Sequence, residues 1–170
     1  PILIYDRLDE PNTLMLEEQL SSLHGGQVAI AFGSGMGAIS TLMMSLVKQG
    51  QKIVAHQTLY GCTYSLLKNW IPRFGIESEF LDLNAFTETN LSKDLTSPSL
   101  KSYLSDSKIR LIYFETLSNP QMEFINFKPL LEAVKNENKN RSDDKKILVA
   151  VDNTFATPWA FRPLEWGFDF

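Results

Sequence analysis

Residues 147–154 read Ile-Leu-Val-Ala-Val-Asp-Asn-Thr, five apolar residues followed directly by a carboxylate. We expect further strands at residues 28–32, 52–55, 76–81 and 109–114, and the inner ones are also near-continuous apolar runs. Such runs are typical of strands that have both faces covered, and strands that alternate with helices indicate a mostly parallel sheet. The sequence therefore predicts an α/β fold with helices on both faces of the sheet.

The segments between these runs carry helix signals. Asn12 or Thr13 can cap a first helix with a stripe of Leu16, Leu20 and Leu23, and Gly25-Gly26 ends it. The other helices are expected at residues 36–48, 63–70, within 91–104, and 129–139. The polar residues 135–146 are interpreted as a solvated helix end and surface loop.

Composition excludes several classes of function. The chain has 170 residues, a net charge of −4 and a pI near 5.2, which favours neither nucleic acid nor an anionic membrane as a partner. The single cysteine, Cys62, forms no internal disulfide and fits a reducing compartment. No signal peptide is visible, so we expect a cytoplasmic protein, and the missing initiator Met suggests a piece of a longer one.

Residues 28–47 contain no charge and are long enough to span a bilayer. Gly33, Gly35 and Gly37 interrupt the first half of this stretch, and serine and threonine side chains occur in it. A strand, a glycine loop and a buried helix explain the stretch better than a membrane span does.

Unusual residues follow four of the expected strands. These segments are Gly33-Ser34-Gly35-Met36-Gly37, residues 56–62 from His56 to Cys62, residues 115–120, and Asp152-Asn153-Thr154. Ligands of open parallel sheets bind at the carboxyl ends of the strands. If the sheet is parallel, the four segments meet at one edge and form one candidate site.

Each of these segments has a structural alternative. The glycine loop opens a helix and can bind phosphate through free backbone amides, or it can simply form a tight turn. Its glycine spacing matches neither the Walker phosphate-binding loop nor the dinucleotide-binding motif. Tyr60 can offer an aromatic face or be a core tyrosine. Asp152 needs a partner at the edge of the core, which can be a helix N-terminus or a cationic group such as a protonated pyridine nitrogen. His24 and His56 are interpreted as structural, and no metal site is expected.

Four ordered motifs then identify a family by resemblance. Residues 34–39, residues 59–64, residues 113–120 and residues 151–165 resemble the Cys/Met-metabolism pyridoxal-phosphate enzymes. The resemblance implies the large domain of fold-type I pyridoxal-phosphate enzymes, present incompletely. It divides the chain into an N-terminal arm with the first helix (residues 1–27) and part of the cofactor-binding large domain (residues 28–170).

The resemblance also implies roles for individual residues. Gly35 and Met36 would hold the cofactor phosphate, Asp152 the pyridine nitrogen, and Thr154 the ring. Tyr60 would stack on the ring and act as acid or base toward the substrate, and Asn119 would lie near the phenolic oxygen. Tyr5 and Arg7 would reach the phosphate of a neighbouring subunit, which implies a homo-oligomer that is a dimer of dimers.

Within the family, the sequence Tyr-Gly-Cys-Thr at residues 60–63 is similar to methionine γ-lyases, where the cysteine lies beside the substrate. The alternative for the whole enzyme is that it acts on cystathionine or O-acetylhomoserine. The alternative for Cys62 is that it packs as a small buried apolar residue. Glu10-Pro11-Asn12-Thr13 and Trp159 depart from the family pattern. The Schiff-base lysine is expected beyond Phe170, so these residues alone are predicted to be inactive, either as part of an active enzyme or as a truncated non-catalytic homologue.

Overall fold

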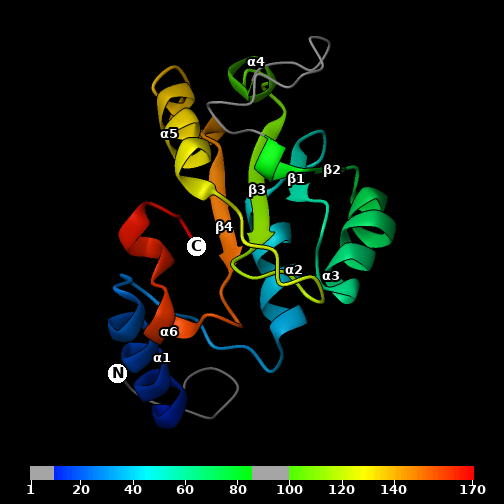
Figure 1. The fold of residues 1–170 in the computed structure, drawn as a ribbon. Coiled ribbons are helices and arrows are strands. Elements are labelled where there is room, and N and C mark those ends of the chain that lie inside the picture. Colours follow the sequence, from blue (N-terminus) through cyan, green and yellow to red (C-terminus); the bar gives the residue numbers. More distant parts are fainter. Residues whose placement is uncertain (1–9, 86–99) are drawn as a thin grey trace.

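The computed structural model describes residues 10–85 and 100–170. A four-stranded sheet in the order β2-β1-β3-β4 forms its centre, and every neighbouring pair is parallel (Figure 1). The strands are β1 (Lys52–His56), β2 (Glu77–Leu81), β3 (Ile109–Glu115) and β4 (Leu148–Asp152). They confirm four of the predicted strands and the parallel sheet.

The α-helices are α1 (Pro11–His24), α2 (Gly35–Leu46), α3 (Gly61–Ser65), α4 (Leu100–Leu104), α5 (Phe127–Asn138) and α6 (Thr157–Ala160). A π-helical turn (Leu66–Trp70) continues α3, and single 3₁₀ turns cover Ile71–Phe74, Leu83–Ala85, Asp143–Lys145 and Pro163–Trp166. Residues 86–99, where much of one predicted helix falls, lie outside the described residues.

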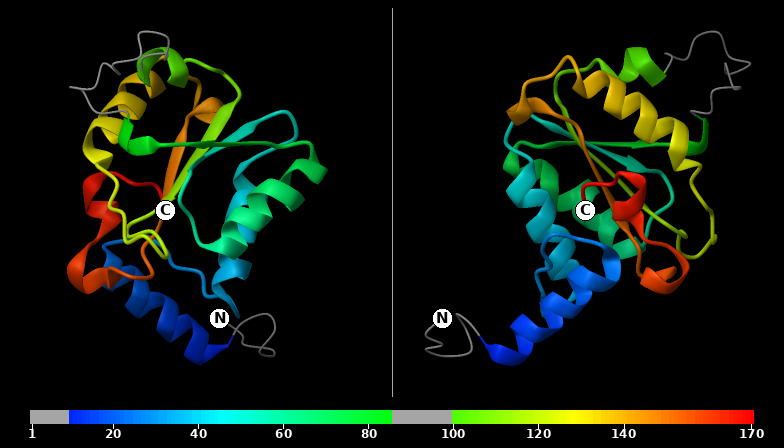
Figure 2. Two further views of the ribbon diagram at one scale, coloured as in Figure 1. Left: turned by 45° about the vertical axis from the view of Figure 1, so that its right-hand side comes forward. Right: turned by 90° about the vertical axis from the view of Figure 1, so that its left-hand side faces the viewer.

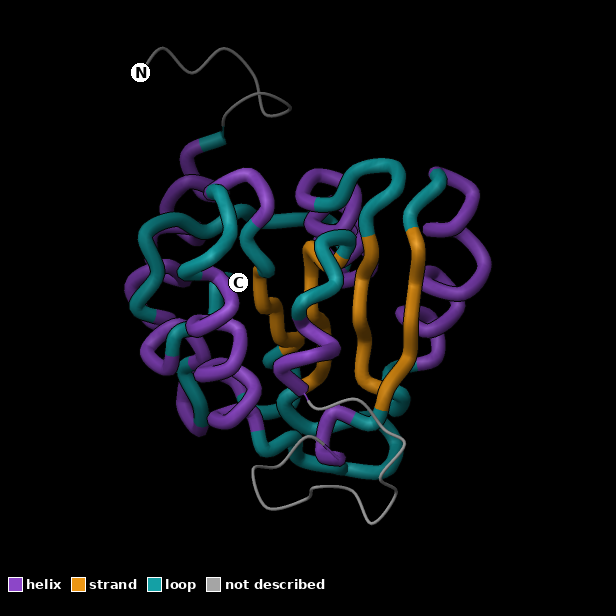
Figure 3. The backbone as a smooth tube through the Cα atoms, turned by 90° about the horizontal axis from the view of Figure 1, so that it is seen from above, coloured by secondary structure: helices purple, strands orange, loops and turns teal. Residues whose placement is uncertain are grey.

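Alternating side chains of the strands fill two separate cores. In β3, Ile112 and Phe114 pack with α5, whereas Leu111 and Tyr113 pack with α2 and the turn after α3. Figure 3 shows the strands at the centre, between helices. Helices therefore cover both faces, as predicted, and each fully buried large side chain stabilises the fold by about 1.5–3 kcal/mol.

The predicted strand at residues 28–32 is wrong. The segment has no regular secondary structure and pairs with no strand of the described residues, and Val28 and Ile30 are exposed. The amide of Ala31 instead donates to the carboxylate of Glu17 in α1, at 2.7 Å. An apolar run indicates a strand only where a partner strand is within reach, and here the backbone hydrogen bond goes to a helix side chain.

Helix α1 also differs from the prediction. Its cap is Glu10, whose carboxylate accepts the amide of Thr13 at 2.9 Å, with Pro11 as the first helical residue; neither Asn12 nor Thr13 is the cap. Gly25 ends the helix in the left-handed conformation, as expected. The expected leucine stripe is not packed, because no residue of α1 is buried. The helix lies below the sheet and near α6 (Figures 1 and 2).

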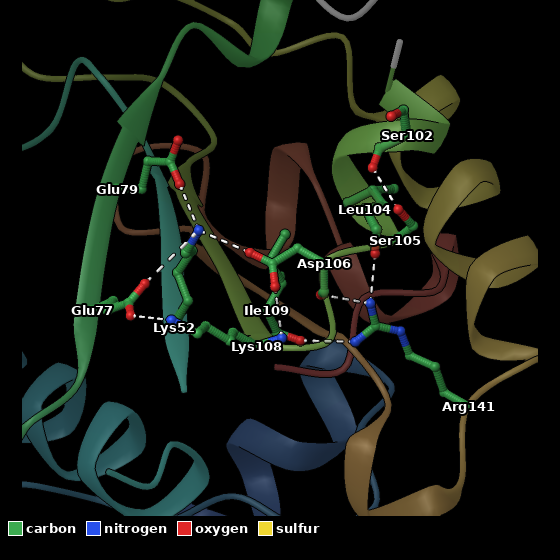
Figure 4. A network of polar contacts seen from close by, with 10 residues as sticks. All are labelled: Lys52, Glu77, Glu79, Ser102, Leu104, Ser105, Asp106, Lys108, Ile109 and Arg141. Atoms are coloured by element: carbon green, nitrogen blue, oxygen red, sulfur yellow. Dashed lines mark hydrogen bonds and ion pairs between the residues drawn. The ribbon is translucent and has the colours of Figure 1, made fainter. Parts of the chain in front are cut away.

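The polar segment after α5 contains one residue that is not solvated. The Arg141 side chain is 8% exposed and donates to the backbone carbonyls of Leu104, Asp106 and Ile109 (Figure 4). It thereby ties the end of α5 to the turn that leads into β3. Among the described residues, no helix has the length and apolar character needed to cross a membrane.

A cluster of charges holds the amino ends of the strands together. The Lys52 ammonium lies 2.9 Å from Asp106, 3.0 Å from Glu79 and 3.9 Å from Glu77 (Figure 4). Burial opposes the charge on Lys52, but its hydrogen bonds to Asp106 and Glu79 outweigh burial and raise the pKa of the ammonium. The Lys108 amide and then Lys52 lower the pKa of Asp106.

We therefore expect Lys52→Met to lower the free energy of unfolding by about 1–2 kcal/mol near neutral pH, because three carboxylates lose their shared cation. A carboxyl group whose pKa is lower in the folded than in the unfolded state stabilises the folded protein at pH values above its unfolded pKa. This stabilisation disappears as the pH falls through the pKa of the folded state. The difference from wild type should thus shrink below about pH 4. Urea unfolding of the complete protein across pH measures it.

Lys108→Met is the matched control, since the Lys108 side chain is 53% exposed and, among the described residues, forms an ion pair with Glu77 alone. An exposed pair contributes at most about 1 kcal/mol. Equal destabilisation by both substitutions at neutral pH would contradict the assignment of Lys52 as the centre of the cluster.

Candidate functional site

A cavity of about 370 Å³ opens where the carboxyl ends of β3 and β4 meet the first turn of α2. Its lining residues are Ser34, Gly35, Met36, Ile39, Tyr60, Glu115, Leu117, Asn119, Asp152, Thr154 and Phe155. All four segments singled out in the sequence contribute to it. The convergence is confirmed, although the glycine segment follows an irregular stretch and not a strand.

The N-terminus of α2 forms one wall of the cavity. The Ser34 hydroxyl accepts the amide of Gly37 at 3.0 Å and so caps the helix. Gly35 and Met36 are the first two residues of the helix, and the amides of such residues have no partner inside the helix. Free amides and the positive end of the helix dipole favour an anion at this wall.

Asp152 ends β4 in another part of the wall. One oxygen of its carboxylate accepts both the amide and the hydroxyl of Thr154, at 3.0 and 2.5 Å, and the other accepts the Tyr113 hydroxyl at 3.4 Å. No cation of the described residues pairs with it. Asp152 caps no helix of the described residues. Of the two partners expected for it, a helix N-terminus or a cationic ligand group, the second is therefore favoured.

Tyr113 is a residue that the sequence reasoning missed. It is 2% exposed beneath the cavity, and burial, followed by the charges of Asp152 and Glu115, raises the pKa of its phenol strongly. The phenol therefore stays protonated and serves Asp152 as a hydrogen-bond donor. A tyrosine inside an apolar strand gave no signal that distinguished it from core packing.

Glu115 ends β3 and belongs to one of the four motifs, but the resemblance implies no role for it. Its side chain is buried, and its two oxygens accept the backbone amides of Tyr60 and Asn119, at 2.6 and 3.1 Å. Glu115 and Asp152 are register partners across the β3–β4 ladder. Two carboxylates thus lie side by side at the edge of the sheet.

Tyr60 lines the cavity and is 44% exposed, so it is not a core tyrosine. A hydrogen bond with Cys62 raises the pKa of its phenol. Cys62 itself is exposed in the first turn of α3 and is not part of the cavity wall, so it is not the buried apolar residue of the alternative interpretation. Tyr5 and Arg7 lie outside the described residues.

His56, Asp82 and Glu123 each place a potential metal-ligand atom within 4.8 Å of the others. The buried ring of His56 is already satisfied, since Nδ1 accepts the Leu83 amide at 3.2 Å and Nε2 can then donate to Glu123 at 3.2 Å. No lone pair of the imidazole is left for a metal ion. We interpret His56 as structural, as the sequence suggested.

The chain is similar to known pyridoxal-phosphate-dependent enzymes. A family model described as Cys/Met metabolism PLP-dependent enzyme matches residues 1–170. An L-methionine γ-lyase of Fusobacterium nucleatum subsp. nucleatum is 38% identical over 167 residues, which are 98% of this chain and 37% of that enzyme. An O-acetyl-L-homoserine sulfhydrylase of Leptospira meyeri is 32% identical over 98% of this chain and 33% of its own.

Solved structures share the fold. A Campylobacter jejuni protein that carries N′-pyridoxyl-lysine-5′-monophosphate superposes with a TM-score of 0.79 and 28% identity, covering 98% of this chain and 36% of that protein. A Corynebacterium glutamicum structure gives a TM-score of 0.80 at 27% identity, with coverages of 96% and 37%. The chain therefore spans little more than a third of the length of these relatives.

Proposed function

The chain belongs to the Cys/Met-metabolism family of pyridoxal-phosphate-dependent enzymes, and on this basis we propose that the complete protein eliminates a thiol from a sulfur amino acid. The proposed reaction is the α,γ-elimination of methionine, which consumes water and gives methanethiol, ammonia and 2-oxobutanoate. The fold is that of the fold-type I members of this group, of which the chain forms an incomplete large domain.

The cavity has the chemistry that pyridoxal phosphate requires. The free amides at Gly35 and Met36 suit a phosphate, and the carboxylate of Asp152 suits a protonated ring nitrogen. Both groups line one cavity, whose wall also includes the aromatic ring of Tyr60. The proposal depends on this observation: free amides for a phosphate, a carboxylate for a ring nitrogen and an aromatic ring line one cavity in a chain of the Cys/Met-metabolism family.

When bound, pyridoxal phosphate withdraws electrons from the substrate carbon from which a proton is removed. Asp152 would keep the ring nitrogen protonated, with Tyr113 and Thr154 orienting its carboxylate. The Tyr60 hydroxyl would donate a proton to the leaving sulfur or accept one from the substrate. Thr154 would lie against the ring, and Asn119 near the phenolic oxygen.

Methionine is proposed as the substrate because the 38% identical relative is an L-methionine γ-lyase and because Cys62 lies close to Tyr60. The alternative is that the protein acts on cystathionine or O-acetylhomoserine. This alternative is supported by two relatives, the O-acetyl-L-homoserine sulfhydrylase at 32% identity and a cystathionine β-lyase of Bacillus subtilis at 34% identity. We further propose a cytoplasmic homo-oligomer in which Tyr5 and Arg7 contact the cofactor of a neighbouring subunit. Residues 1–170 alone are proposed to be inactive.

Gly35→Pro tests the anion wall. Proline is tolerated as the first residue of a helix, and a Cβ at Gly35 meets nothing within 4 Å, so the helix should persist while one amide is lost. We expect the apo form of the complete protein to bind pyridoxal phosphate about 10-fold or more weakly, as for a lost hydrogen bond to a charged group. Gly35→Ala keeps the amide and should bind normally; equal affinity of both variants would contradict the assignment.

Tyr60→Phe tests the proton transfer. The aromatic ring remains and the hydroxyl is lost, so kcat for elimination should fall by about 100-fold or more while cofactor affinity changes little. Steady-state kinetics and cofactor titration measure the two quantities. Unchanged kcat would rule out the acid–base role of Tyr60.

Substrate profiling of the complete protein tests the reaction itself. We expect a higher kcat/KM for methionine than for cystathionine or O-acetylhomoserine, with 2-oxobutanoate and methanethiol as products. A preference for cystathionine would replace the proposed substrate but keep the reaction class. Absence of cofactor-dependent turnover with all three substrates would overturn the proposed function.

A further inference from the structure

The buried carboxylate of Glu115 joins two loops that come from different parts of the chain. Its Oε1 accepts the amide of Tyr60 at 2.6 Å, and its Oε2 accepts the amide of Asn119 at 3.1 Å. Tyr60 precedes α3, whereas Asn119 lies in the loop after β3. One side chain, 5% exposed, thus fixes the separation of two residues in the cavity wall.

Keeping a carboxylate at this position is costly. Burial raises the pKa of Glu115, and although the amides of Tyr60 and Asn119 lower it, burial together with the neighbouring charge of Asp152 leaves it above its usual range. Both oxygens nevertheless meet N–H donors, an arrangement that suits the ionised form and gives charge-assisted hydrogen bonds. A glutamine could accept only one of the two amides, because its nitrogen is a donor. The geometry therefore requires a carboxylate, and not merely a polar side chain of this size.

We propose, on the basis of the proposed function, that Glu115 is a positioning residue for the reaction. It holds the backbone of Tyr60 and of Asn119 at one separation, so that the phenol and the amide side chain lie correctly around the cofactor. Glu115 also lines the cavity, but in this role it acts through the backbone of Tyr60 and of Asn119 and not on the reacting atoms. A displacement of about 1 Å of a reacting group can lower the rate about 100-fold, so such a support is consequential.

The test uses the complete holoenzyme with Glu115→Gln and Glu115→Asp. The glutamine has the length but leaves one amide unpaired; the aspartate has the charge but is too short to reach both amides. We expect kcat to fall by about 10-fold or more in both variants, and the circular-dichroism bands of the bound cofactor to weaken. Cofactor affinity should fall less, because the α2 amides and Asp152 are unchanged.

Glu123→Gln is the matched control, since Glu123 lies in the loop that follows β3 and hydrogen-bonds His56 and Asn84 but does not line the cavity. It should leave kcat and the cofactor bands as in wild type. Recovery of wild-type kcat in Glu115→Asp would show that only the charge matters and would overturn the positioning role.

The outcomes separate this inference from the proposed function. A wild-type protein that binds pyridoxal phosphate, with Glu115 variants of unchanged kcat and cofactor bands, would overturn the inference alone. A wild-type protein that binds no pyridoxal phosphate would overturn the proposed function. If Glu115→Gln does not fold, Glu115→Asp decides the matter, since it retains the negative charge.

Discussion

The parallel pairing of β1, β3 and β4 is the constraint on which the remaining structure depends. Because these strands run in one direction, their last residues, His56, Glu115 and Asp152, reach the same edge of the sheet. The register pairs Glu115 directly with Asp152. Two carboxylates at one edge repel each other, so the surrounding residues must supply hydrogen-bond donors. The amides of Tyr60 and Asn119 and the hydroxyls of Tyr113 and Thr154 do so.

This division of donors gives the two carboxylates different functions. Both oxygens of Glu115 are satisfied within the protein, which makes it a structural support. Asp152 faces the cavity without a cation among the described residues, which leaves it available to a positively charged ligand group. The amides of α2 in the same cavity attract the opposite charge. A ligand with a phosphate and a cationic ring matches this polarity.

The sequence predicted most of the sheet and the location of the site because both follow from local patterns. Apolar runs mark β1, β3 and β4, and the residues after them line the cavity, as the parallel arrangement required. The strand predicted at residues 28–32 is wrong because an apolar run carries no information on whether a partner strand is present. Glu115 could not be assigned because both of its partners are backbone amides, and the amide of Tyr60 is 55 positions away in the sequence. Those contacts exist only in the folded chain.

A crystal structure of the complete protein with pyridoxal phosphate tests the account most directly. We expect the phosphate at the amides of Gly35 and Met36, the ring nitrogen at the carboxylate of Asp152, and Glu115 still bridging the amides of Tyr60 and Asn119. A cofactor bound in a different cavity, or one in the reverse orientation with its phosphate beside Asp152, would contradict the account.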